Sequence, residues 1–187
     1  AKRALLCDGL GSGKTFTSFA SIRNLFEKEK EEVFPLLVVC PNSTKISWKR
    51  AIETIWPGLT VTVIGGTAAQ RKKQFKDPSH VYIINWEGLK SHSRIAPYGN
   101  HAIKRCTECG GKDPKVKPAS CQAHLRELNH IEFKAVIADE AHRMKSASAV
   151  QTRALKAATG DAEYRFALTG TPIANAPDDL WSILNWL

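Results

Sequence analysis

The sequence predicts one α/β domain in which a parallel β-sheet is covered by helices on both faces. Short β-rich runs alternate with longer helical stretches along most of the 187 residues, which is the pattern of strands joined by crossover helices. One strand-like run leads straight into a glycine-rich turn and a helix, the context of a phosphate-binding loop (P-loop). With 43% hydrophobic and 24% charged residues, the composition is ordinary for a globular domain and excludes collagen-like and disordered chains.

Six strand candidates supply the sheet. They are short apolar or β-branched runs, at 4–7, 36–40, 60–64, 81–84, 135–138 and 165–168. The run 36–40 is apolar throughout and is stopped by Pro41, as expected for a parallel strand that is buried on both faces.

Five helix candidates lie between and after these strands, at 15–30, 43–55, 67–75, 148–158 and 177–187. In the second of them, apolar residues recur at close to helical spacing from Ile46 to Ile55. Ser43 or Thr44 is its expected N-cap, because a hydroxyl there can accept a hydrogen bond from a free N–H of the first turn.

The glycine-rich turn reads DGLGSGKT at 8–15. Glycines allow successive N–H groups to point into one concavity, and the following helix N-terminus adds partial positive charge, so polyphosphate binds there. We assign the ATP phosphates and Mg²⁺ to this turn, with Lys14 on the β- and γ-phosphates and the Thr15 hydroxyl on Mg²⁺. The assigned residues are Gly11, Ser12, Gly13, Lys14 and Thr15. The first motif position is Asp8 and not glycine, which leaves open an ordinary strand-to-helix turn with a surface lysine.

The run 135–138 ends in DEAH at 139–142. Ligands of α/β sheets gather beyond the carboxyl ends of the strands, so Asp139 is expected in the same crevice as Lys14. Asp139 is predicted to hold Mg²⁺ through water, and Glu140 to position and deprotonate the attacking water. Lys14, Asp139 and Glu140 are therefore the catalytic candidates. His142 is expected either to couple this site to a nucleic-acid site or to be an ordinary polar residue after a strand.

The segment from about 98 to 129 breaks the α/β alternation and is predicted to be a small zinc-ribbon-like insertion. It contains C-x₂-C and C-x₂-H pairs, and four such N and S ligands suit tetrahedral Zn²⁺. The ligand candidates are Cys106, Cys109, Cys121 and His124, with His101 as an alternative fourth ligand. Three free thiols in a loop are the other interpretation. Basic residues outnumber acidic ones in the segment, so it could contact nucleic acid or a protein partner.

Basic residues outnumber acidic ones in the whole chain, 27 against 18, for a formal net charge of +9. The excess favours an anionic partner such as nucleic acid, although a surface charged for solubility also fits. Five cysteines, an odd number, do not suit a disulfide framework and indicate an intracellular, reducing compartment: cytoplasm, or nucleus in a eukaryote. No run approaches the 18 apolar residues of a membrane span. The chain starts without Met and ends on an apolar run, so we expect a fragment of a longer protein.

Three motifs together resemble motifs I, II and III of superfamily 2 helicase-like ATPases. They are DGLGSGKT at 8–15, DEAH at 139–142, and LTGTPIAN at 168–175 continued by LWSILNWL at 180–187. The last run is most similar to SWI/SNF-related DNA translocases, in which the phosphate loop also commonly begins with Asp. VVCPN at 38–42 followed by Trp48 looks like motif Ia, and IINWE at 83–87 looks like motif Ib.

The resemblance implies the N-terminal one of two RecA-like lobes of an ATP-driven motor that tracks along duplex DNA. It places nucleic-acid contacts at Asn42, Ser43, Trp86, Thr169 and Thr171. Motifs IV to VI and their arginine fingers belong to a second lobe that is missing from this chain. We therefore expect the chain to bind Mg-ATP weakly and to hydrolyse it poorly alone. Contacts to DNA phosphates should weaken steeply with added salt.

Two other functions stay open on the sequence. DEAH also names a group of RNA helicases, so an RNA helicase lobe is the second hypothesis. The third is a non-catalytic nucleic-acid- or protein-binding module that uses the cysteine segment, with a vestigial phosphate loop. The complete set of Lys14, Thr15, Asp139 and Glu140 argues against the third.

Overall fold

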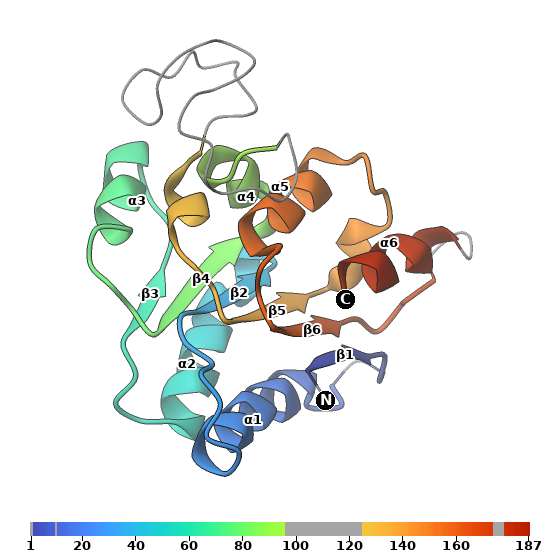
Figure 1. Cartoon of the computed structure of the whole chain (residues 1–187), viewed down its shortest axis with the longest axis horizontal. Helices are drawn as coiled ribbons and strands as arrows, with labels where there is room; N and C mark the ends of the chain where they lie inside the picture. The colour runs from blue at the N-terminus through green and yellow to red at the C-terminus, as the bar shows by residue number, and fades with distance from the viewer. Residues whose placement is uncertain (1, 10, 96–124, 174–177) are drawn as a thin grey trace.

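The computed structural model describes residues 2–9, 11–95, 125–173 and 178–187. Its centre is a six-stranded sheet in the order β1-β6-β5-β2-β4-β3, and every neighbouring pair is parallel (Figure 1). The strands are β1 (Arg3–Leu6), β2 (Leu36–Cys40), β3 (Val61–Val63), β4 (Val81–Asn85), β5 (Ala135–Asp139) and β6 (Tyr164–Leu168). The predicted parallel α/β sheet is confirmed.

In the described part of the chain, six α-helices and three short 3₁₀ turns lie between the strands or, for the last helix, after them. The helices are α1 (Lys14–Glu27), α2 (Lys45–Ile55), α3 (Ala68–Gln74), α4 (Trp86–His92), α5 (Val150–Thr159) and α6 (Asp178–Trp186). The 3₁₀ turns are η1 (Asn42–Thr44), η2 (Glu127–His130) and η3 (Ala141–Met144). Within the described part of the chain, no helix is long and apolar enough to cross a membrane.

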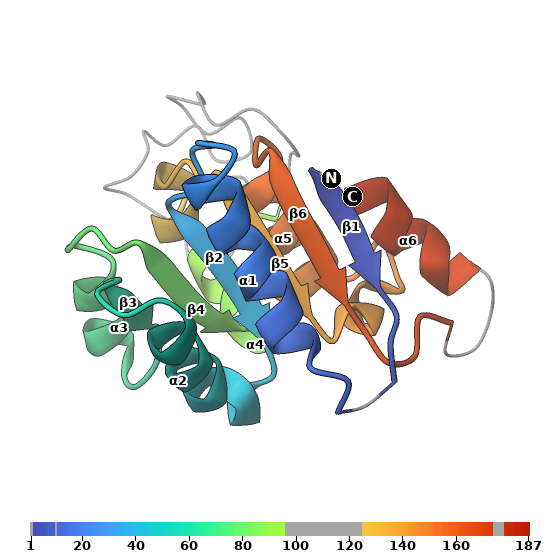
Figure 2. The ribbon, with the colours of Figure 1, turned by 90° about the horizontal axis from the view of Figure 1, so that it is seen from below.

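The sheet is buried on both faces, as the continuous apolar run of β2 predicts. Leu37 and Val39 belong to a core under α4, α5 and α6, whereas Leu36, Val38 and Cys40 belong to a second core under α1 and α2. This alternation follows from the two-residue period of a strand. Figure 2 shows α1 and α2 together on one side of the sheet. Parallel strands covered on both sides in this way leave their ends as the accessible parts of the sheet.

The carboxyl ends of the central strands align at one edge. In the register of the sheet, Asp139 lies beside Leu168, and Leu168 lies beside Leu6. Cys40 similarly lies beside Asn85 at the end of β4. The segments that follow these strands therefore start from the same edge, and they include the predicted phosphate loop, the DEAH segment and the motif Ia, Ib and III segments.

Helix α4 was not predicted from the sequence, which indicates only a strand and a turn at 83–87. Trp86, Leu89 and His92 are all buried and lie three residues apart, so one face of a short helix packs on the core. The expected helix start at 43–55 also differs. Thr44 occupies the N-cap position of α2, but its hydroxyl donates to the carbonyl oxygen of Pro41 at 3.1 Å and does not cap the helix.

The predicted insertion also ends earlier than about residue 129. Leu125, Leu128 and Asn129 are buried, and Leu128 belongs to the core under α4, α5 and α6. The side-chain oxygen of Asn129 accepts from the backbone N–H of Arg94 at 2.7 Å, and its amide donates to Ser93 Oγ at 3.1 Å. These residues belong to the α/β domain. The zinc candidates Cys106, Cys109, Cys121 and His124, and the alternative His101, lie outside the described residues.

Candidate nucleotide site and its neighbours

The phosphate loop connects β1 to α1 and depends on glycine for its backbone. Gly11 and Gly13 have φ of 77° and 81°, the left-handed region that other L-residues rarely adopt. A Cβ atom at Gly9, Gly11 or Gly13 would meet nothing within 4 Å, so Gly11 and Gly13 are required for their backbone conformation and not for lack of space. Gly13 is the N-cap of α1 without a side-chain cap, and no acidic residue lies in the first turn. The first N–H groups of the helix can therefore bind an anion.

Lys14 lies against this loop. Its Nζ donates to the carbonyl oxygens of Asp8 at 2.6 Å and Gly9 at 2.7 Å. The ammonium group is thus held where the loop turns, by backbone atoms. Asp8 contributes through its backbone carbonyl, so this contact does not depend on the residue type at the first motif position.

Asp139 lies at the end of β5, with each carboxylate oxygen held by one N–H donor. Trp48 Nε1 donates to Oδ2 at 2.8 Å, and the backbone N–H of Glu140 donates to Oδ1 at 3.0 Å. Burial raises the pKa of this carboxyl above its usual value, and the Glu140 charge adds to the rise. The hydrogen bond from Trp48 and the Lys14 charge oppose the rise, so Lys14 and Asp139 are close enough to interact electrostatically.

Thr15 and Asp139 provide a hydroxyl and a carboxylate of the kind that Mg²⁺ prefers. The carboxylate keeps free lone pairs on both oxygens beside its two N–H donors. The residues therefore fit a magnesium ion that is bound partly through water. Among the described residues, no group of three or more His, Cys, Asp and Glu side chains could hold a metal ion.

Glu140 takes a backbone conformation that is uncommon outside glycine, with φ 53° and ψ 50°. Such a conformation costs of order 1–3 kcal/mol and persists only where the surroundings fix it. Here His142 Nδ1 lies 3.2 Å from Glu140 Oε2 and 3.2 Å from Thr169 Oγ1. The Thr169 hydroxyl also accepts from the backbone N–H of Thr171 at 3.1 Å. His142 therefore links Glu140 to the segment after β6. Its predicted coupling to a nucleic-acid site stays a prediction.

The predicted nucleic-acid residues fall into two groups. Asn42, Ser43 and Thr171 are exposed at the carboxyl edge of the sheet. Trp86 and Thr169 are both 0% exposed. The Trp86 indole donates to the backbone carbonyl oxygen of Asp139 at 2.9 Å, inside the domain. The prediction that these two side chains contact nucleic acid directly is therefore corrected. Both are buried and form hydrogen bonds with the acidic segment.

Two features of the site escaped the sequence prediction. One is the bond from Trp48 to Asp139, because motif Ia identifies Trp48 without assigning it a partner 91 positions away. The other is an ion pair between Arg143 Nη1 and Glu87 Oε1 at 2.6 Å. The hydrogen bonds from Arg143 and from Asn85 lower the pKa of Glu87 to about 2. A charge pair between distant segments has no signal in a single sequence.

A family model for the SNF2-related domain matches residues 1–187. The chain belongs to the SNF2-related domain family. It is 30% identical over 192 residues to chromodomain-helicase-DNA-binding protein 7 of Homo sapiens, which covers 100% of this chain and 6% of that protein. It is also 30% identical over 196 residues to the chromodomain-helicase-DNA-binding protein 3 homolog of Caenorhabditis elegans, covering 98% of this chain and 10% of that protein.

The SNF2-related chain also resembles a solved structure described as the Sulfolobus solfataricus SWI2/SNF2 ATPase core in complex with dsDNA. The TM-score is 0.66 at 26% identity, over 98% of this chain and 31% of that one. The chain therefore spans less than a third of that protein and a tenth or less of the curated relatives named above. The match confirms the N-terminal RecA-like lobe of a superfamily 2 helicase-like ATPase.

Proposed function

We propose that this chain is the nucleotide-binding lobe of an ATP-dependent motor that moves along duplex DNA. The supporting observation is the convergence at one sheet edge of the phosphate loop, the acidic segment and Thr169, with His142 in contact with both Glu140 and Thr169. A motor requires such a link, because hydrolysis at the nucleotide site has to change the conformation of the site that binds DNA.

Each candidate has a defined part in hydrolysis. The N–H groups of the loop and Lys14 bind the β- and γ-phosphates. When it does so, the Lys14 ammonium gives up its hydrogen bonds to the carbonyls of Asp8 and Gly9 and donates to phosphate oxygens instead. Thr15 and Asp139 would hold Mg²⁺, which would supply positive charge to the phosphates when bound. Glu140 orients the attacking water and accepts its proton. His142 holds the Glu140 carboxylate, so a shift of Thr169 changes where that base points.

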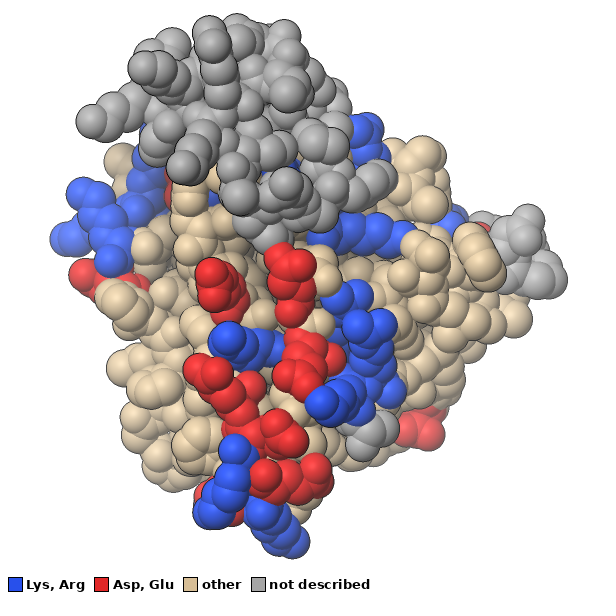
Figure 3. Space-filling model, in the orientation of Figure 1, with Lys and Arg blue, Asp and Glu red and all other residues tan. Residues whose placement is uncertain are grey.

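Duplex DNA is proposed as the polyanion at the same edge. Asn42, Ser43 and Thr171 are exposed there, and polar side chains of this kind contact phosphates without reading sequence. Acidic and basic side chains are mixed on the face seen in Figure 3, so the net charge of +9 does not make that face a uniformly basic surface. The SWI2/SNF2 core of Sulfolobus solfataricus, by its title, was solved with dsDNA.

The chain alone is proposed to bind Mg-ATP and to turn it over slowly, because arginines of a second lobe supply much of the transition-state stabilisation in such ATPases. The test measures binding of a fluorescent ATP analogue and phosphate release, with and without duplex DNA. Lys14→Ala should abolish binding, Glu140→Gln should keep it, and turnover should be negligible in all arms. Lys28→Ala, at the other end of α1, is the matched lysine control.

Three outcomes would overturn parts of this proposal. Rapid DNA-stimulated turnover that both variants abolish would show that the chain completes its own active site. Stimulation by RNA in place of duplex DNA would favour an RNA helicase lobe. Absence of nucleotide binding at millimolar Mg-ATP would favour a non-catalytic binding module.

We also propose that the cysteine segment binds one structural zinc ion. The support is the pairing of Cys106 with Cys109 and of Cys121 with His124, each separated by two residues. Elemental analysis of the purified chain should give about one zinc per chain. Far less zinc, with all of these thiols reacting freely, would contradict the zinc site.

A further inference from the structure

Two buried tryptophans donate their indole N–H groups to the same residue. Trp48, 1% exposed on α2, donates to the Asp139 carboxylate at 2.8 Å. Trp86, at the start of α4, donates to the Asp139 backbone carbonyl at 2.9 Å. The two indoles come from the segments after β2 and β4. Trp86 fixes the backbone at the end of β5, and Trp48 fixes the Asp139 carboxylate.

The Trp48 contact is specific in its chemistry. Indole is a donor only, and a buried N–H needs an acceptor. Trp48 packs in the core that includes Cys40 and Ile52, so its ring has little freedom to turn away. A bond to an ionised carboxylate is also stronger than one between neutral groups. The ring is therefore fixed by packing, and its N–H fixes one oxygen of Asp139.

The two N–H donors together define the carboxylate plane. Trp48 holds Oδ2 and the backbone of Glu140 holds Oδ1, so rotation of the Asp139 side chain would break both bonds. Neither donor uses all the lone pairs of its oxygen, which leaves acceptor positions for metal-bound water. Removing the indole N–H leaves Oδ1 held and Oδ2 free.

We propose that Trp48 is a positioning residue that orients the Asp139 carboxylate for Mg²⁺ in the nucleotide complex. The proposal rests on the proposed ATPase function. Neighbours that orient a metal ligand usually contribute about 10- to 100-fold to metal affinity. Trp48→Phe keeps an aromatic ring in the core but removes the donor. We expect it to raise, by about tenfold or more, the Mg²⁺ concentration at which Mg²⁺ has half of its maximal effect on nucleotide binding.

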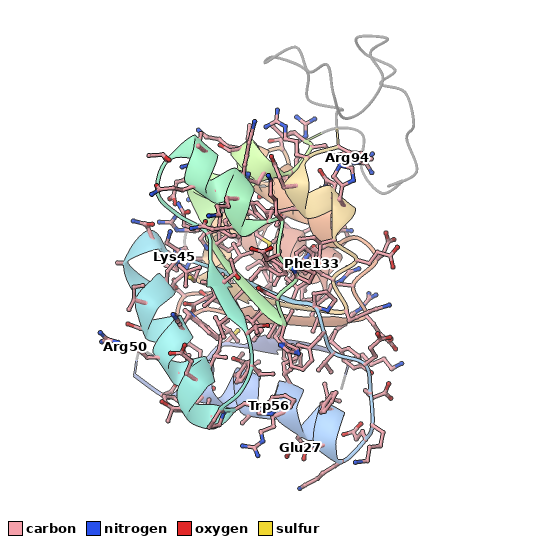
Figure 4. All side chains as sticks on the ribbon, turned by 90° about the vertical axis from the view of Figure 1, so that its left-hand side faces the viewer. Glu27, Lys45, Arg50, Trp56, Arg94 and Phe133 are labelled. Atoms are coloured by element: carbon pink, nitrogen blue, oxygen red, sulfur yellow. The ribbon has the colours of Figure 1, made fainter. Side chains whose placement is uncertain are left out.

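The experiment measures binding of a fluorescent ADP analogue to the chain, first in EDTA and then along a Mg²⁺ titration. A positioning role predicts unchanged affinity in EDTA, where the loop and Lys14 hold the phosphates, and a shifted Mg²⁺ midpoint. The matched control is Trp56→Phe. Trp56 packs against Phe26 and Phe34 with tilted rings, and it lies at the end of α2 opposite Lys45 (Figure 4).

A second measurement uses the wild-type chain and does not depend on the variant folding. The indole Nε1–H resonance of Trp48 should move when Mg²⁺ is added to the ADP-bound chain, and that of Trp56 should stay. The positioning role would be overturned if Trp48→Phe and Trp56→Phe had the same Mg²⁺ midpoint. It would also be overturned if the Trp48 resonance did not shift when Mg²⁺ is added. Failure of the wild-type chain to bind nucleotide at all would instead overturn the proposed function.

Discussion

The phosphate loop and the acidic segment reach the same edge of the sheet but are held in different ways. In the loop, Gly11 and Gly13 adopt positive φ, and Lys14 bonds to backbone carbonyls within its own turn. The acidic segment is fixed by side chains from far along the sequence: Trp48, Trp86 and Thr169. One half of the site is thus specified by local backbone geometry and the other by tertiary packing.

This difference indicates that the acidic segment, and not the phosphate loop, is the half of the site whose conformation can be changed by other elements of the fold. A loop that is specified by its own residues changes only when those residues change. A segment that is held by three other elements can be moved by any of them. Energy from hydrolysis and signals from a nucleic-acid partner are therefore expected to pass through residues 139–142.

The strongest way to break the acidic side is Trp86→Ala. Removal of this fully buried side chain leaves a cavity beside β4 and takes the donor from the Asp139 carbonyl, at an expected cost of about 3–5 kcal/mol in the free energy of unfolding. Urea unfolding followed by circular dichroism measures it. Trp86→Phe, which keeps most of the apolar volume, should cost clearly less. A loss below about 1 kcal/mol for Trp86→Ala would mean that the indole is not part of the support.

A smaller effect is expected on the loop side from Gly13→Ala. The φ of 81° costs an alanine roughly 1–2 kcal/mol, and relief of that strain would distort the N–H groups that face the phosphates. Both the unfolding free energy and the affinity for the ATP analogue should fall. Gly9→Ala is the stability control, because Gly9 lacks a positive φ and a Cβ there meets nothing within 4 Å. Equal stability losses in the two variants would remove the backbone explanation.

The smallest effect is predicted for the pair of Glu87 and Arg143, which ties α4 to η3. Hydrogen bonds from Arg143 and Asn85 lower the pKa of Glu87 to about 2 from its ordinary value of 4.5. A depressed folded-state pKa adds stability that is fully present above pH 4.5 and is lost as the pH falls towards 2. The pair is about half exposed, so its contribution should stay below about 1 kcal/mol.

Unfolding of wild type and Glu87→Gln from pH 7 to pH 3 tests this interaction. The stability difference between them should be constant above about pH 5 and shrink below it. A difference that persists unchanged at pH 3 would assign the effect to packing and not to charge.

Sequence alone located the sheet closely, because its cues are local. Each predicted strand agrees with the structure within one residue at either end, since apolar runs bounded by Pro, Gly or charged residues mark where a buried strand begins and stops. The phosphate loop was equally readable, because its glycines and Lys14 lie within eight consecutive positions.

The remainder depended on contacts that no local pattern encodes. Helix α4 was missed because its buried face consists of only Trp86, Leu89 and His92, too few to establish a period. Trp86 and Thr169 were expected at a nucleic-acid surface and are inside, because a motif identifies a position without saying which way its side chain turns. The Trp48 bond to Asp139 joins residues that only the completed sheet brings together.

The amide of Asn129 has a consequence for the segments on either side of residues 96–124. It bonds to Ser93 and Arg94 on one side of residues 96–124 and to the backbone N–H of Arg126 on the other, and it also donates to the carbonyl of Ala157. The two ends of that stretch are thereby anchored to each other and to α5. Loss of the Asn129 amide is therefore expected to release these two anchors from each other and from α5, whatever the length of the sequence between them.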